Sequence, residues 1–178
     1  MKKLLAIILA LVTLTFAVSC DFNWLSVELP ENQIVLIYRY ENHASDHQDL
    51  GYFITGNGNM YKFDFSNRRS DGFASDLEEF QEIIRTEKPK HTVGANKAKR
   101  IYYYATQIDE NAKFESEDGS CDAGRATLSV YNGKGFITIS KYVDVVGELD
   151  DESAREIIGL FEKGIRDRYR LRFNSVAD

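Results

Sequence analysis

The chain has 178 residues, of which 22 are lysine or arginine and 28 are aspartate or glutamate, giving a net charge of −6. This length suits one domain that buries an adequate core without disulfides, and the sequence contains only two cysteines. An acidic chain with no basic patch outside its C-terminus argues against nucleic acid as a partner and against electrostatic adhesion to anionic lipid.

The first twenty residues have the pattern of an export signal. Lys2 and Lys3 follow Met1, and the run from Leu4 to Val18 contains no charged residue. A helix needs about 20 apolar residues to cross a bilayer, and this run is shorter. A cationic start, a short apolar core and small residues at its end are typical of a removable signal peptide, which we predict over residues 1–19.

The end of this signal, Ala17-Val18-Ser19-Cys20, resembles the lipobox of bacterial lipoproteins, with Ala17 where leucine is usual. The resemblance implies cleavage before Cys20, which would then carry a diacylglyceryl group and a further acyl chain such as palmitate. Acyl chains of this kind anchor a protein durably in the lipid bilayer. Because Ala17 and Ser19 also suit the ordinary signal peptidase, a secreted product without lipid is the alternative.

Residues 20–30 are expected to form a short membrane-proximal segment, and the first strand follows it. The run from Gln33 to Tyr40 is almost continuously apolar, β-branched or aromatic, which predicts a central strand buried on both faces. Strands over Gly51–Thr55 and Met60–Phe65 flank a glycine- and asparagine-rich turn, which predicts a hairpin.

Two helices are predicted next. The first begins at Ser75 with a capping box and ends before Pro89, which lacks a backbone donor. The second begins near Asn96 and carries three consecutive tyrosines, so at least one ring must face solvent or a ligand. We note Tyr103 and Tyr104 as candidate binding residues, although an aromatic side chain at helical spacing is more often part of the core.

The last third of the chain predicts a second hairpin, over Ala126–Tyr131 and Gly135–Tyr142, and one more strand over Tyr142–Leu149. A final helix is capped by Asp150 or a residue just after it. The predicted fold class is therefore α+β: a single domain over residues 31–178, with an antiparallel sheet of five to seven strands and about three helices packed on one face.

One loop carries metal-ligating residue types. Between the first two predicted strands lie His43, Asp46, His47 and Asp49, and imidazole and carboxylate groups are ligands of zinc and similar ions. A polar surface loop is the interpretation that we favour, because no known spacing supplies a further strong ligand nearby. The acidic stretch from Glu115 to Gly124 also lacks the alternating pattern of a calcium loop, so no cofactor is predicted.

The sequence contains no nucleophile elbow, phosphate-binding glycine loop or zinc-protease motif, so it predicts no catalytic residue. In signal, size and layout it resembles the small uncharacterised lipoproteins that bacteria display on the outer side of the cytoplasmic membrane. The resemblance implies an extracytoplasmic, lipid-anchored protein of the cell envelope. We expect a non-catalytic module that binds a protein or a small ligand. The alternatives are a metal-dependent hydrolase using the loop from His43 to Asp49 and a structural envelope spacer.

Overall fold

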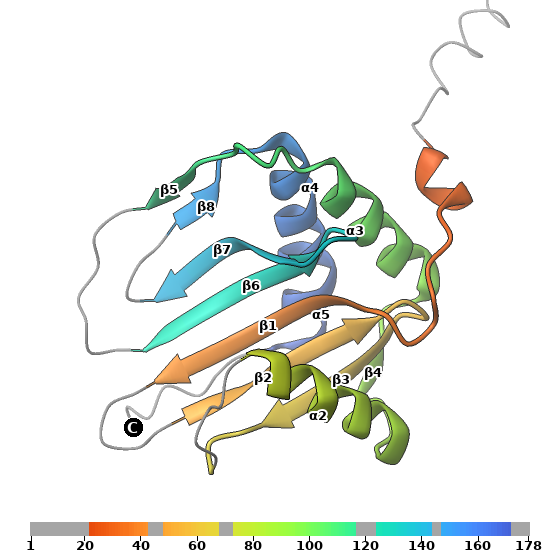
Figure 1. The fold of residues 1–178 in the computed structure, drawn as a ribbon, viewed down its shortest axis with the longest axis vertical. Helices are drawn as coiled ribbons and strands as arrows, with labels where there is room; N and C mark the ends of the chain where they lie inside the picture. Colours follow the sequence, from red (N-terminus) through yellow and green to blue (C-terminus); the bar gives the residue numbers. More distant parts are fainter. Residues whose placement is uncertain (1–21, 43–47, 68–72, 117–123, 144–146, 172–178) are drawn as a thin grey trace, which may run out of the picture.

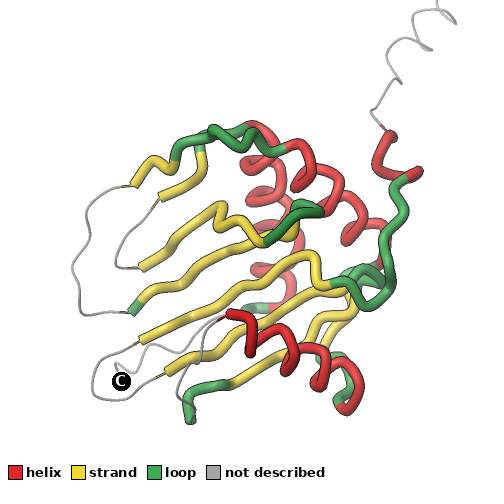
Figure 2. Tube along the Cα trace, viewed as in Figure 1, coloured by secondary structure: helices red, strands yellow, loops and turns green. Residues whose placement is uncertain are grey.

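The computed structural model describes residues 22–42, 48–67, 73–116, 124–143 and 147–171. These residues form one α+β unit around an antiparallel sheet of eight strands, in the order β4-β3-β2-β1-β6-β7-β8-β5 (Figures 1 and 2). The strands are β1 (Ile34–Asn42), β2 (Gln48–Thr55), β3 (Asn59–Asp64), β4 (His91–Thr92), β5 (Phe114–Ser116), β6 (Arg125–Tyr131), β7 (Phe136–Val143) and β8 (Gly147–Leu149).

Three helices of ten or more residues accompany the sheet: α2 (Phe73–Thr86), α3 (Ala95–Gln107) and α4 (Glu152–Phe161). A short 3-10 helix, η1 (Phe22–Ser26), precedes the sheet and contacts α3. The chain continues from α4 into a π-helical turn, η2 (Glu162–Arg166), and a last helical turn, α5 (Asp167–Tyr169). No helix among the described residues is long and apolar enough to cross a membrane.

The sheet has more strands than the sequence predicted. Both predicted hairpins are confirmed as β2–β3 and β6–β7, and the last predicted strand is confirmed as β8 over its final residues. The additional strands are β4, which pairs two residues with β3, and β5, which pairs three residues with β8. The prediction of five to seven strands was wrong because strands this short contain too few residues to display a period of two.

The helices cover both faces of the sheet, whereas the sequence analysis placed them on one. Figure 1 shows α3 and α4 behind the sheet and α2 in front of β2 and β3. Two separate apolar clusters correspond to these layers. The cluster behind the sheet contains Ile101 of α3 and Phe161 of α4, and the cluster in front contains Phe80 of α2. The placement on one face was wrong because each face of β1 carries apolar side chains that need cover.

β1 is the central strand, as predicted. It pairs antiparallel with β2 on one side and with β6 on the other, and its residues 34–40 are all buried. Val35 and Tyr38 face α3 and α4, while Ile34 and Ile37 face α2.

The helix boundaries agree with the sequence except at one end. α3 lies where its periodicity predicts, and the Asp151 side chain caps α4 by accepting a hydrogen bond from the Ala154 N–H at 2.9 Å. α2 begins at Phe73, ahead of the predicted start, so Ser75 lies within the helix and the predicted capping box is wrong.

Gly58, in the β2–β3 turn, has φ +80° and approaches the Gly94 backbone too closely for any Cβ atom.

Phe80 joins α2 to the sheet. Its side chain is fully buried, and its ring lies 4.8 Å from that of Phe53 and 5.0 Å from that of Phe63, measured between centroids. Phe65 packs on the same ring at 5.4 Å. Aromatic pairs at these separations stabilise a core beyond the apolar area that they bury, so Phe80 contributes much of the stability with which α2 packs on the sheet.

We therefore expect Phe80→Ala to lower the free energy of unfolding by about 3–5 kcal/mol, the usual loss for a fully buried phenylalanine. Urea denaturation measures this loss directly. Glu78→Ala, on the exposed side of the same helix, serves as the control and should change stability by no more than about 0.5 kcal/mol. Similar effects from the two substitutions would contradict the packing described for α2.

Candidate functional site

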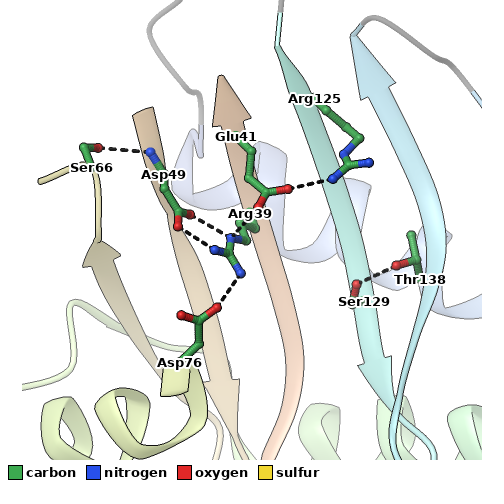
Figure 3. Close-up of polar contacts among 8 residues, drawn as sticks. All are labelled: Arg39, Glu41, Asp49, Ser66, Asp76, Arg125, Ser129 and Thr138. Atoms are coloured by element: carbon green, nitrogen blue, oxygen red, sulfur yellow. Dashed lines mark hydrogen bonds and ion pairs between the residues drawn. The ribbon is translucent and has the colours of Figure 1, made fainter. Parts of the chain in front are cut away.

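A buried arginine organises the face of the sheet that α2 covers. The Arg39 side chain, on β1, is 11% exposed. Its Nε donates a hydrogen bond to Asp49 Oδ1 at 2.7 Å, and its Nη2 donates to Asp49 Oδ2 at 2.5 Å (Figure 3). This two-point contact uses the planar fork of the guanidinium and both oxygens of the carboxylate. Asp49 is therefore fully engaged by a group from the neighbouring strand.

The same guanidinium holds the start of α2. Arg39 Nη1 donates to Oδ2 of Asp76, in the first turn of that helix, at 2.7 Å. A carboxylate in the first turn is also favoured by the helix dipole. Glu41 lies 3.3 Å from Arg39 Nε and accepts from Nη2 of Arg125, on β6, at 2.9 Å (Figure 3). The charged cluster of Arg39, Glu41, Asp49, Asp76 and Arg125 thus connects three strands to α2.

Strand register explains why these groups meet. Glu41 is paired directly with Asp49 on β2 and with Arg125 on β6, and Arg39 lies one pleat away on the same face of β1. Burial lowers the pKa of Arg39, but the hydrogen bond and charge of Asp49, with the charges of Glu41, outweigh burial and raise it further above its usual value. The guanidinium is therefore charged at neutral pH, as arginine side chains in proteins are.

α2 and the outer edge of β3 enclose a groove of about 400 Å³. We define the β3 groove by its lining residues, which come from β3 and its end, from α2, and from the segment leading to β4: Lys62, Phe63, Asp64, Phe65, Glu79, Glu82, Ile83, Glu87 and Lys90. In Figure 1, α2 crosses in front of β3 near this edge of the sheet.

The strand edge along this groove is only partly paired. β4 pairs with Asn59 and Met60 alone, so the described strands leave β3 without an outer neighbour from Tyr61 to Asp64. The Met60 carbonyl accepts from the Lys90 N–H at 2.8 Å on the outer side, whereas the Phe65 N–H turns inward and donates to Asp49 O at 2.6 Å. Since backbone groups along a strand alternate between its two neighbours, those of Lys62 and Asp64 point outward.

Acidic groups dominate the charge of the β3 groove. Its lining contains four carboxylates (Asp64, Glu79, Glu82 and Glu87) and two ammonium groups (Lys62 and Lys90). Hydrogen bonds from Ser66 hold the pKa of the Asp64 carboxyl below its usual value, and the charge of Lys62 adds to this effect. Arg85 pairs with Glu82 on the helix surface, where both side chains are exposed. With Glu82 paired to Arg85, the lining still has three carboxylates against two ammonium groups, and this excess of negative charge favours a cationic occupant.

The residues that the sequence analysis named for lipidation and for metal binding do not form a site among the described residues. Cys20, His43, Asp46 and His47 lie outside the described residues. Asp49, the fourth member of the predicted metal loop, is bound to Arg39. Within the described ranges, no group of three or more histidine, cysteine, aspartate or glutamate residues is arranged to hold a metal ion.

Tyr103 and Tyr104 lie on α3 and are half-buried. Their rings meet edge to face at a centroid distance of 5.5 Å, and the Arg100 guanidinium lies 5.7 Å from the Tyr104 ring. Tyr104 also packs against the cluster behind the sheet. Neither tyrosine lines the β3 groove.

The sequence analysis missed Arg39, Asp76 and the β3 groove. Arg39 had a detectable signal, because a lone arginine within an otherwise apolar strand must find a carboxylate partner. Asp76 had none, since its role depends on how α2 lies on the sheet. For the groove, Lys62 and Asp64 alternate with aromatic residues, a pattern typical of a strand with one solvent-exposed face, but the pattern does not show that the edge of the strand is open.

Comparison with known proteins finds no match: no protein-family model, no curated protein and no solved structure matches the chain.

Removing the Arg39 guanidinium should leave Asp49 and Asp76 without their cationic partner, whereas Glu41 keeps its contact with Arg125. We expect Arg39→Met to lower the free energy of unfolding by about 3–5 kcal/mol, as when one partner of a buried ion pair is lost. The triple variant Arg39→Met, Asp49→Asn, Asp76→Asn should recover much of this stability, because it buries no uncompensated charge from these groups. Urea denaturation of both variants tests the prediction, and a triple variant no more stable than the single one would contradict it.

Arg155→Met is the matched control. Arg155 pairs with Asp150 at the surface, where its side chain is 59% exposed. Exposed pairs of this kind contribute at most about 1 kcal/mol.

Proposed function

We propose that this protein is a lipid-anchored, extracytoplasmic interaction module that engages its partner through the β3 groove. The observation that carries the binding role is the open outer edge of β3, which lies along an acidic groove beside α2. A concave surface next to unpaired backbone groups is a common site for recognition. The anchor itself rests on the lipobox-like sequence that ends at Cys20.

The charged cluster supports a binding role by keeping the groove rigid. Asp76 and Phe80, one turn apart on α2, are each held to the sheet, the first by Arg39 and the second by the aromatic cluster. The helix wall of the groove is therefore fixed before any partner arrives. Preorganised surfaces bind more tightly because less conformational entropy is lost on association.

The metal-dependent hydrolase is the weaker alternative. Of its four candidate ligands, Asp49 directs both carboxylate oxygens at Arg39. A metal in this loop would have to compete with a buried guanidinium for that carboxylate, or be held by His43, Asp46 and His47 without it. No feature of the described residues favours the hydrolase over the interaction module.

Replacing the lipid-bearing sulfur tests the anchor. With Cys20→Ser, we expect the protein to move from the membrane fraction to the soluble extracytoplasmic fraction, or to accumulate as an uncleaved precursor, because serine cannot form the thioether to lipid. Fractionation followed by mass measurement of the mature chain checks this. Normal cleavage of the variant, together with a soluble wild-type protein, would overturn the anchor.

Photo-crosslinking in the intact cell tests the groove. A benzophenone amino acid at position 82, whose side chain lines the groove and is 50% exposed, should yield a cross-linked partner. The same group at position 81 is the matched control, because Gln81 is exposed on the same helix but does not line the groove. The expected outcome is a product at position 82 that is absent or much weaker at position 81.

Equal products at the two positions would show that contact is not specific to the groove. No product at position 82, in cells where the chain remains membrane-bound, would favour the envelope spacer over the interaction module.

A further inference from the structure

Building on the proposed binding role, we infer that the β3 groove accepts an extended, basic peptide segment that pairs with β3 as an additional strand. The inference names both the class of partner and its mode of binding. It rests on three features of the groove: the direction of its backbone groups, the shape of its walls and the sign of its charge.

The backbone of β3 is prepared for another strand. The N–H and C=O groups of Lys62 and Asp64 point to the side where β4 has ended. The Lys90 N–H already makes the corresponding outer bond to Met60 O, at 2.8 Å. A guest segment that continues the line of β4 would extend the same hydrogen-bond ladder. Strand addition to an exposed sheet edge draws its affinity from such main-chain bonds.

The walls of the groove restrict how the guest lies. Phe63 and Phe65 belong to the apolar cluster under α2, while Lys62 and Asp64 are exposed on the opposite face of the strand. Side chains of a guest strand would alternate in the same way. Those on the α2 side would meet Ile83, which is half-buried, with acidic residues around it.

A long cationic side chain can contact both the apolar Ile83 and the acidic residues around it. A lysine or arginine can lay its apolar stem along Ile83 and extend its charged end to Glu87. Because Arg85 pairs with Glu82, three carboxylates remain in the lining against two ammonium groups, and this excess of negative charge complements such a guest. We therefore expect lysine or arginine at alternate positions of the partner segment.

The probe is the peptide acetyl-Lys-Thr-Lys-Thr-Lys-Thr-amide, tested on the full chain as the cell produces it, in detergent. Binding should be saturable, and it should slow hydrogen exchange of the Lys62 and Asp64 amides relative to those of β5. The corresponding Glu-Thr peptide should not bind. Two further peptides carry backbone N-methyl groups, one on all lysines and the other on all threonines.

These two methylated peptides have identical composition and charge, and they differ only in which edge of the guest strand is blocked. Strand pairing requires one of them to bind at least about tenfold more weakly than the other, since only one edge faces β3. If both bind as well as the parent, strand addition is overturned, although the groove remains a binding surface. If no peptide binds at millimolar concentration, the inference fails, while cross-linking at position 82 still judges the proposed function separately.

Two substitutions at one position give a second test. Lys62→Pro removes the outward N–H at a point where edge strands tolerate proline, and Lys62→Gln removes only the charge. We expect the proline variant to bind the Lys-Thr peptide at least about tenfold more weakly and the glutamine variant to bind it at least as well as the wild type. Equal binding by the proline variant and the wild type would overturn the role assigned to the β3 edge.

Discussion

The arrangement of the sheet and α2 depends on one charge that is largely removed from water. Arg39 lies within a strand that is buried on both faces, and its guanidinium is stable there only because Asp49, Asp76 and Glu41 surround it. These partners come from β2, α2 and β1 itself. An apolar contact would allow α2 to slide, whereas hydrogen bonds in a fixed fork specify one position along the sheet. The interaction therefore contributes specificity of placement at least as much as net stability.

Local periodicity predicted the elements of the fold well. The apolar run of β1, the turn residues of both hairpins and the stripe of α3 are signals that neighbouring residues generate among themselves. β4 and β5 left no such signal, because their pairing is decided by the strands that they meet. The error about helix cover was avoidable. A central strand that is apolar on both faces already requires a layer on each side, and the prediction of three helices on one face conflicted with it.

The candidate site was much less predictable. Asp49 was noticed as a possible metal ligand on account of the nearby histidines, but its partner is an arginine ten residues earlier, on the neighbouring strand. Asp76 resembled an ordinary acidic residue at the start of a helix. The β3 groove has no counterpart in any single segment, since it exists only where α2 passes the point at which β4 ends. Surfaces of this kind arise from the relation between elements, and periodicity within one segment contains no information about them.

The position of β1 has a consequence for how the chain folds. β2 follows β1 closely in the sequence, but β6, the other neighbour of β1 in the sheet, comes only after α2 and α3. Until then, one full edge of the most apolar strand has no partner. Closing a long loop is slow compared with forming a hairpin, so this edge is exposed for much of the folding time. The segment most vulnerable to wrong association is thus the innermost strand of the finished protein, and the risk falls to a minimum once β6 has docked.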